Sequence, residues 1–100
     1  MDRSDVISLV KRTFTTDEIG QQIPADTTRD VFCAVSSISQ SEWFEAGRNG
    51  LKPEYRVDMF FPEYDGEEIV EYHGTRYGVY RTYRRNNEVL ELYLERKAGL

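Results

Sequence analysis

The sequence of 100 residues contains one cysteine and one histidine, and both scarcities exclude whole classes of site. A lone Cys33 cannot form an internal disulfide or a cysteine-rich zinc site. A lone His73 cannot form a metal site built from several histidines. No apolar run approaches the length of a membrane span, and residues 1–5 lack the basic and then apolar pattern of a signal peptide. We therefore expect no membrane association, and the default expectation is a location in the cytoplasm or inside an assembly built there.

The charge balance also excludes a class of protein. Thirteen Lys and Arg stand against 18 Asp and Glu, which gives a net charge of −5. A protein whose main task is to grip a nucleic acid backbone needs a basic face. Apolar residues make up 39% and aromatic residues 13% of the chain, which is the composition of a folded domain rather than a disordered one.

The first half of the chain predicts two strands and a helix around an irregular segment. Strands are expected at residues 6–10 and 30–38, the second with both faces largely buried. Residues 14–28 fit either a long polar loop or two ragged strands joined at residues 17–20. Ser39 followed three residues later by Glu42 is a capping-box pattern, so we expect a helix over residues 39–47 that ends at Gly47.

The second half alternates apolar and polar residues as strands do. We expect strands at residues 55–59, 68–72, 75–83 and 88–95. A two-residue hairpin turn at His73-Gly74 would pair Glu71 with Arg76 and Val70 with Tyr77. A similar turn at Asn86-Asn87 would pair Thr82 with Glu91, Tyr83 with Leu90 and Arg85 with Glu88.

These elements predict a mainly β fold. The expected architecture is a small antiparallel β-barrel of about six strands, because closure hides the strand edges that an open sheet of this size would expose. One short helix and a long polar loop complete it. Residues 1–100 are expected to form a single domain, since the chain is long enough for one domain and not for two.

The sequence offers no convincing catalytic site. His73 lies in a predicted tight turn without a recognisable partner, and Cys33 lies in an apolar strand where an inert buried thiol is expected. A cluster of acidic residues, Glu63, Asp65, Glu67 and Glu68, lacks the ligand order of a calcium loop and is better explained as a solvated turn. We therefore expect no enzymatic activity, no catalytic residue, no metal and no cofactor.

Two aromatic clusters suggest binding instead. Tyr80, Tyr83, Arg84 and Arg85 interleave aromatic and basic side chains, a combination by which small barrels bind single-stranded nucleic acid. Glutamates on the next strand offset that charge, so cross-strand pairing is the alternative explanation. Trp43 and Phe44 are adjacent on the predicted helix and point about 100° apart, so one of them is expected to be available to a neighbour.

Four segments of the chain resemble the phage head closure proteins, which are also called head completion or head–tail joining proteins. The segments are residues 16–21 (TDEIGQ), 44–55 (FEAGxxGLKPEY), 70–83 (VEYxGxxYxVYRTY) and 90–93 (LELY). The resemblance covers essentially the whole chain. The order and spacing of the four segments, more than any one of them, make the match specific.

The resemblance implies a non-enzymatic β-barrel of the virion. Such proteins assemble as a ring below the portal of the DNA-filled head, by way of an adaptor ring, and offer a surface to the tail while packaged DNA passes through. The protein is expected to form a ring on assembly and to be monomeric when isolated. Residues 13–28 and 39–53 are long and non-periodic for a small domain, so we expect them to supply the subunit or partner contacts. The candidate contact residues are Asp17, Ile19 and Gln21 in the first segment and Trp43, Phe44, Arg48 and Leu51 in the second. The alternatives are a tail-terminator or tail-completion protein, or a small-barrel nucleic-acid binder.

Overall fold

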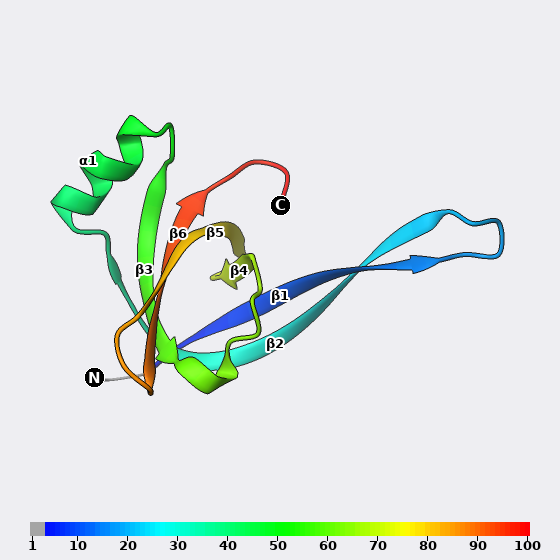
Figure 1. Cartoon of the computed structure of the whole chain (residues 1–100), viewed down its shortest axis with the longest axis horizontal. Coiled ribbons are helices and arrows are strands. Elements are labelled where there is room, and N and C mark those ends of the chain that lie inside the picture. The colour runs from blue at the N-terminus through cyan, green and yellow to red at the C-terminus, as the bar shows by residue number, and fades with distance from the viewer. Residues whose placement is uncertain (1–3) are drawn as a thin grey trace.

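The strand order closes into a ring. In the computed structural model, which describes residues 4–100, six strands form a closed antiparallel barrel in the order β1-β2-β3-β6-β5-β4 (Figure 1). The fold class expected from the sequence is confirmed. The elements are β1 (Asp5–Thr16), β2 (Gln22–Ser37), α1 (Gln40–Arg48), β3 (Pro53–Phe60), the 3-10 helix η1 (Phe61–Glu63), β4 (Ile69–Tyr72), β5 (Thr75–Arg84) and β6 (Val89–Arg96).

Alternating apolar residues fill the inside of the barrel. Leu92 and Leu94 of β6 are fully buried, and so are Val57 and Met59 of β3, as the alternation of these strands predicts. Tyr55 and Phe61 pack against this core at its margin, and Ile7, Leu9 and Val70 complete it from the opposite wall.

β1 and β2 extend beyond the barrel as a two-stranded arm. All 12 residues of β1 pair with β2, but β3 pairs with β2 only from Cys33 to Ser37. Figure 1 shows the remainder projecting far from the barrel, and the longest dimension of the molecule is 49 Å. Residues 14–28 are therefore parts of two strands joined at residues 17–21, and the alternative of a long polar loop was wrong. Pro24 is tolerated because its strand pairs on one side there.

The barrel closes through a short seam between β1 and β4. β4 has four residues, and three register pairs join it to β1: Ser8 with Glu71, Leu9 with Val70 and Val10 with Ile69. By comparison, β3 and β6 share seven register pairs. The seam is the narrowest contact in the ring of strands.

The hairpin between β4 and β5 has the predicted register. Glu71 pairs with Arg76 and Val70 with Tyr77. His73 and Gly74 have φ values of 50° and 78°, the left-handed pair that a two-residue turn of this type requires. The His73 ring stacks on Tyr72 with 3.9 Å between ring centroids. The turn residue is thus held by a local contact.

The turn between β5 and β6 differs from the prediction by one residue. Tyr83 pairs with Glu91 and Thr82 with Leu92, so the expected pairs of Tyr83 with Leu90 and Thr82 with Glu91 were wrong. The Asn86 Oδ1 atom accepts hydrogen bonds from the amides of Glu88 and Val89, both at 2.8 Å. The Asn86 side chain therefore organises a four-residue turn from residue 85 to 88, with the Arg85 amide bonded to the Val89 carbonyl, in place of a two-residue one.

Three further expectations need correction. Phe32 is 65% exposed, because one face of β2 lies outside the barrel, so β2 is not buried on both faces. The helix continues through Gly47 to Arg48, and Gly50, with a φ of 77°, follows its end.

The side chain of Glu67 is buried and not solvated as expected. It is 5% exposed and accepts hydrogen bonds from the Asp65 amide and from Arg29. The first three residues, part of the segment examined for a signal peptide, lie outside the described residues.

Candidate interaction surfaces

The tip of the arm is shaped by one carboxylate. The Asp17 Oδ1 atom accepts hydrogen bonds from the amides of Ile19 at 3.0 Å and Gln21 at 2.8 Å. The Asp17 side chain thus holds the turn, with Gly20 at a φ of 83° closing it. Ile19 is 78% exposed at the outermost point of the arm. The three contact residues predicted in this segment therefore lie together at the tip.

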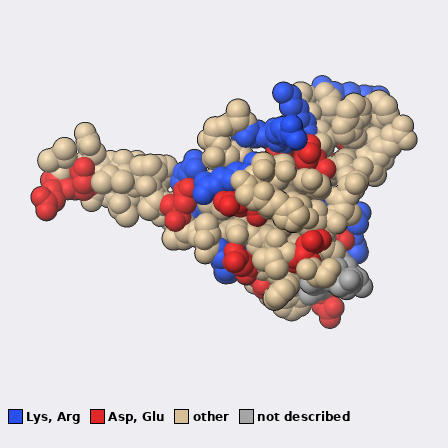
Figure 2. Space-filling model, turned by 180° about the vertical axis from the view of Figure 1, so that it is seen from behind, with Lys and Arg blue, Asp and Glu red and all other residues tan. Residues whose placement is uncertain are grey.

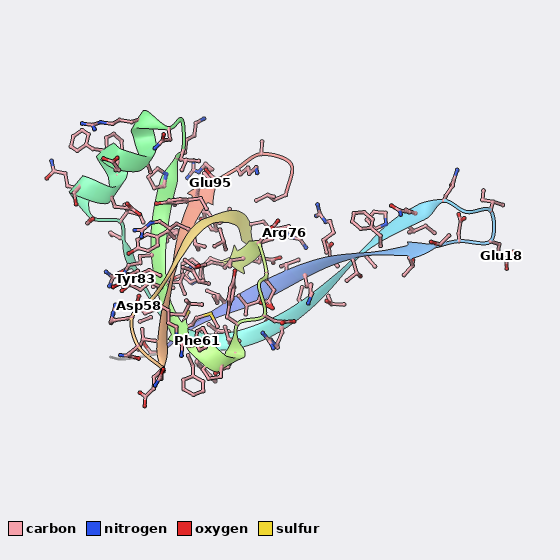
Figure 3. All side chains as sticks on the ribbon, viewed as in Figure 1. Glu18, Asp58, Phe61, Arg76, Tyr83 and Glu95 are labelled. Carbon is pink, nitrogen blue, oxygen red and sulfur yellow. The ribbon has the colours of Figure 1, made fainter. Side chains whose placement is uncertain are left out.

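The arm is apolar without a core beneath it. Phe14 is 60% exposed and Ile23 is 47% exposed. Phe14 faces Pro24 in the register and Ile23 faces Thr15, which places Phe14 and Ile23 on opposite faces of the two-stranded ribbon. Figure 2 shows this surface as largely uncharged, with carboxylates at its far end, and Figure 3 places Glu18 there. A two-stranded ribbon of this kind is marginal in water unless something packs on it.

Ion pairs fix the direction of the arm at its base. Asp26 accepts hydrogen bonds from Arg12 Nε at 3.0 Å and from Arg76 Nη1 of β5 at 2.9 Å. Lys11 Nζ lies 2.8 Å from Asp65 Oδ2. The hydrogen bond from Lys11 lowers the pKa of Asp65, and those from Arg12 and Arg76 lower the pKa of Asp26. Salt screens these ion pairs, and each contributes little to stability. They therefore orient the arm relative to the barrel without holding it rigidly.

Helix α1 is docked on the barrel through one carboxylate. Ser39 caps the helix by accepting the Glu42 amide, as predicted. The Glu42 Oε1 atom turns outward to β5, where it accepts hydrogen bonds from Arg81 Nη2 at 2.6 Å and Nε at 3.0 Å and from the Tyr80 hydroxyl at 3.3 Å. Arg81 in turn lies over the Tyr93 ring, 3.9 Å from its centroid. Burial and the nearby Glu42 charge raise the pKa of Tyr80.

This docking leaves the aromatic side of the helix in solvent. Ala46 is buried, whereas Trp43 is 53% exposed and Phe44 is 54% exposed. Their rings contact edge to face at a centroid distance of 5.2 Å. Both aromatics are available to a neighbour, where the sequence predicted only one. Of the other two residues predicted here, Arg48 is exposed and Leu51 is half-buried, its amide bonded to the Ala46 carbonyl.

We expect Arg81→Met to loosen the helix while leaving the barrel folded. The substitution removes both guanidinium hydrogen bonds to Glu42 and keeps an apolar stem over Tyr93. Trp43 is the single tryptophan and lies on α1, so its fluorescence anisotropy reports helix mobility and is expected to fall. The free energy of unfolding is expected to drop by about 1 kcal/mol. Arg12→Met, which breaks an ion pair at the arm, is the matched control. Unchanged anisotropy in Arg81→Met would show that other contacts hold the helix.

The four nucleic-acid candidates do not form one basic surface. Tyr80 is half-buried beneath the helix, whereas Tyr83 is 53% exposed. The Arg84 guanidinium lies over the Phe61 ring, 3.9 Å from its centroid, and donates to the side chain of Asn87 at 2.8 Å. Arg85 is paired with carboxylates. The cationic groups of Arg84 and Arg85 are thus engaged within the chain, which favours the alternative explanation of cross-strand pairing.

A buried charge cluster on the outside of the β3-β6 pair was missed from the sequence. Asp58 and Glu91 are register partners with side chains only 7% and 8% exposed. Arg85 bridges them, with Nη2 3.2 Å from Asp58 Oδ2 and 2.7 Å from Glu91 Oε2. Arg56 pairs with Asp58, and the Tyr93 hydroxyl donates to Glu91 at 2.5 Å. Figure 3 shows Asp58 on this side of the molecule.

The single cysteine lies in an inert setting. Cys33 is fully buried, and burial together with the charges of Asp5 and Asp58 raises the pKa of its thiol to about 12.

An open hollow of about 710 Å³ lies where the arm leaves the barrel, lined by residues that include Phe14, Ile69 and Val79. Across residues 4–100, no group of three or more His, Cys, Asp or Glu is placed to hold a metal ion. In the same residues, no helix is long and apolar enough to cross a membrane.

Comparison with known proteins identifies no family for this chain. No protein-family model matches it and no curated protein does. The resemblance of its four sequence segments to head closure proteins therefore stays a prediction, and it enters below as part of a proposal.

Proposed function

We propose that this protein is a structural subunit of the phage head–tail connector. It forms a ring below the portal and adaptor, closes the DNA-filled head and presents a docking surface to the tail. The observation that carries the proposal is the placement of exposed apolar side chains. Phe14, Ile19 and Ile23 lie on an arm that projects from the barrel, and Trp43 and Phe44 lie on a peripheral helix.

Such surfaces suit a subunit completed by its neighbours. Exposed apolar clusters mark interaction sites on small proteins. The two clusters lie in the two long, non-periodic segments that the sequence predicts as contacts. The net charge of −5 per copy suits a conduit for DNA, because basic walls would retain phosphate. The protein acts within the virion, at the head–tail interface, after assembly in the bacterial cytoplasm.

The alternatives differ in what supports them. A tail-terminator or tail-completion role would use the same kinds of surface. It differs because the protein would then complete the tail and not the DNA-filled head. For the nucleic-acid binder, Tyr83 is exposed, but Arg84 and Arg85 are engaged within the subunit. The connector proposal uses the exposed clusters of both arm and helix, so it accounts for more of the surface.

The proposal is tested by combining Trp43→Ala and Phe44→Ala in a phage assembly assay. The double variant should fold, because both rings are half exposed and surface substitutions shift stability by about 0.5 kcal/mol or less. Heads are expected to package DNA and then lose it, and tails should remain unjoined. The measurement counts DNA-filled heads, empty heads and free tails by electron microscopy.

Tyr83→Ala is the matched control, since it removes an aromatic ring of equal exposure, 53%, from β5. It should assemble normally. Filled heads joined to tails in the double variant would contradict the proposal. Filled, stable heads beside defective tails would indicate the tail-completion alternative.

A further inference from the structure

Two exposed apolar surfaces lie on opposite sides of the barrel. We name them the arm tip and the helix patch. The arm tip consists of Asp17, Glu18 and Ile19 at the turn, with Phe14 and Ile23 on the two faces of the ribbon behind it. The helix patch consists of Trp43, Phe44 and Arg48. Figure 1 shows the arm and α1 projecting in different directions from the barrel. A single copy therefore cannot bring its own arm tip to its own helix patch.

We propose that the arm tip of one copy binds the helix patch of the next copy, in a head-to-tail contact. This inference deepens the proposed function and rests on it for the identity of the occupant, a second copy of the chain. Because the two surfaces differ, the contact is heterologous, and repetition produces either a closed ring or an open filament.

Charge disfavours the pairing of two arm tips. Residues 13–25 contain Asp17 and Glu18 and no Lys or Arg. The helix patch contains Arg48, whose side chain is 78% exposed. Two arm tips in contact would bring four carboxylates together, since each tip contributes two, whereas each helix patch offers an exposed arginine beside Glu45. Arm tip against helix patch places opposite charges around apolar centres, which favours that encounter.

Arg48 is free to exchange partners. Its ion pair within the helix is with Glu45, at 3.8 Å between Nη1 and Oε2, and both side chains are at least 70% exposed. An exposed pair of this kind contributes little to stability. A carboxylate arriving with an arm tip can therefore replace or share it at small cost.

The contact is expected to be weak between two free copies. Five apolar side chains are far fewer than the roughly 20–30 residues per side of a stable interface. The contact therefore gains strength when copies are held together in a ring. A covalent trap captures it in purified protein, and the chain offers a clean background, because the one native thiol, Cys33, is fully buried with a raised pKa.

The experiment uses two single-cysteine additions, Gln21→Cys at the arm tip and Gly47→Cys beside the helix patch, with a short bis-maleimide linker. Gly47 lies one turn after Trp43 and Phe44, and a Cβ atom at this position meets nothing within 4 Å. Thr75→Cys, in the exposed β4-β5 hairpin, is the matched control.

An equal mixture of the Gln21→Cys and Gly47→Cys proteins should convert from monomer to a dimer and stop there. The protein carrying both substitutions should give a ladder of higher multimers, and each single variant alone should stay monomeric. Dimers from Gln21→Cys alone or Gly47→Cys alone would overturn the head-to-tail contact, as would a mixture that links no better than Thr75→Cys. If cross-linking fails but the Trp43→Ala and Phe44→Ala double variant still blocks phage assembly, the connector proposal stands and only the head-to-tail contact is wrong. If the double variant assembles normally, the connector proposal itself is contradicted.

Discussion

Replacing Arg85 by methionine is expected to lower the free energy of unfolding by about 3 kcal/mol at neutral pH. Arg85 bridges Asp58 and Glu91, whose side chains are 7% and 8% exposed. Its removal leaves two buried carboxylates on adjacent strands with Arg56 as the remaining cation beside Asp58. The estimate stays at the lower end for a broken buried pair, because the Arg85 side chain is itself 40% exposed.

The loss should shrink in acid. Burial raises the pKa of Glu91, but hydrogen bonds from Tyr93 and Arg85 outweigh it, and the net pKa is lowered. A lowered pKa contributes stability above the unfolded value of about 4.3, and this contribution disappears as pH falls through the folded value. Arg85→Met removes part of the lowering. The two proteins should therefore differ most near pH 7 and converge as the pH falls below the lowered folded-state pKa of Glu91.

Urea unfolding at several pH values measures this difference. Arg84→Met is the control, because Arg84 lies next in sequence but covers Phe61 and bonds within the exposed turn. It should cost less than about 1 kcal/mol at every pH. Equal losses for the two variants, or an Arg85→Met loss that does not change with pH, would show that the buried carboxylates are stabilised by other groups.

Shortening the arm should abolish assembly and spare the barrel. The variant deletes residues 13–25 and joins Arg12 to Asp26, which are register partners, through an Asn-Gly turn. All of the deleted residues lie outside the core. The free energy of unfolding should change by no more than about 1 kcal/mol, since few buried contacts are lost and fewer residues need ordering.

Chemical unfolding and the phage assembly assay measure the two halves of this prediction. The barrel should unfold as cooperatively as the full-length chain, while heads fail to retain DNA. A control that replaces only Thr15 and Gln22 by alanine keeps the arm at full length and should assemble. Normal assembly with the shortened arm would remove the arm from the contact surfaces. Loss of cooperative unfolding would make the arm part of the folding unit.

Local chemistry made part of the fold predictable. The His73-Gly74 turn fixed its own register, because both residues adopt positive φ and the flanking pairs are complementary in charge and apolarity. The Asn86-Asn87 turn was placed correctly and paired wrongly, since the Asn86 side chain accepts two amides and widens the turn. A side chain that competes with the backbone for hydrogen bonds leaves no trace in apolar alternation.

The candidate surfaces were predictable as segments and not as geometry. The non-periodic sequence at residues 14–28 marked an unusual segment. No local pattern showed that β1 and β2 would extend beyond the other strands of the barrel. The bonds of Glu42 to Arg81 join residues 39 apart in the chain, and the pair of Arg85 with Asp58 spans 27. Contacts at such separations depend on which strands become neighbours, so they follow from the closed barrel and not from a motif.

The short seam between β1 and β4 is where we expect the barrel to open first. Three register pairs close the barrel there, so a sub-global opening along this line breaks fewer hydrogen bonds than separation of any longer strand pair. Such an opening uncovers two strand edges at once, and uncovered edges are templates for pairing with other chains. In the proposed ring, the fidelity of assembly would therefore depend on how rarely this seam opens before one copy reaches the next.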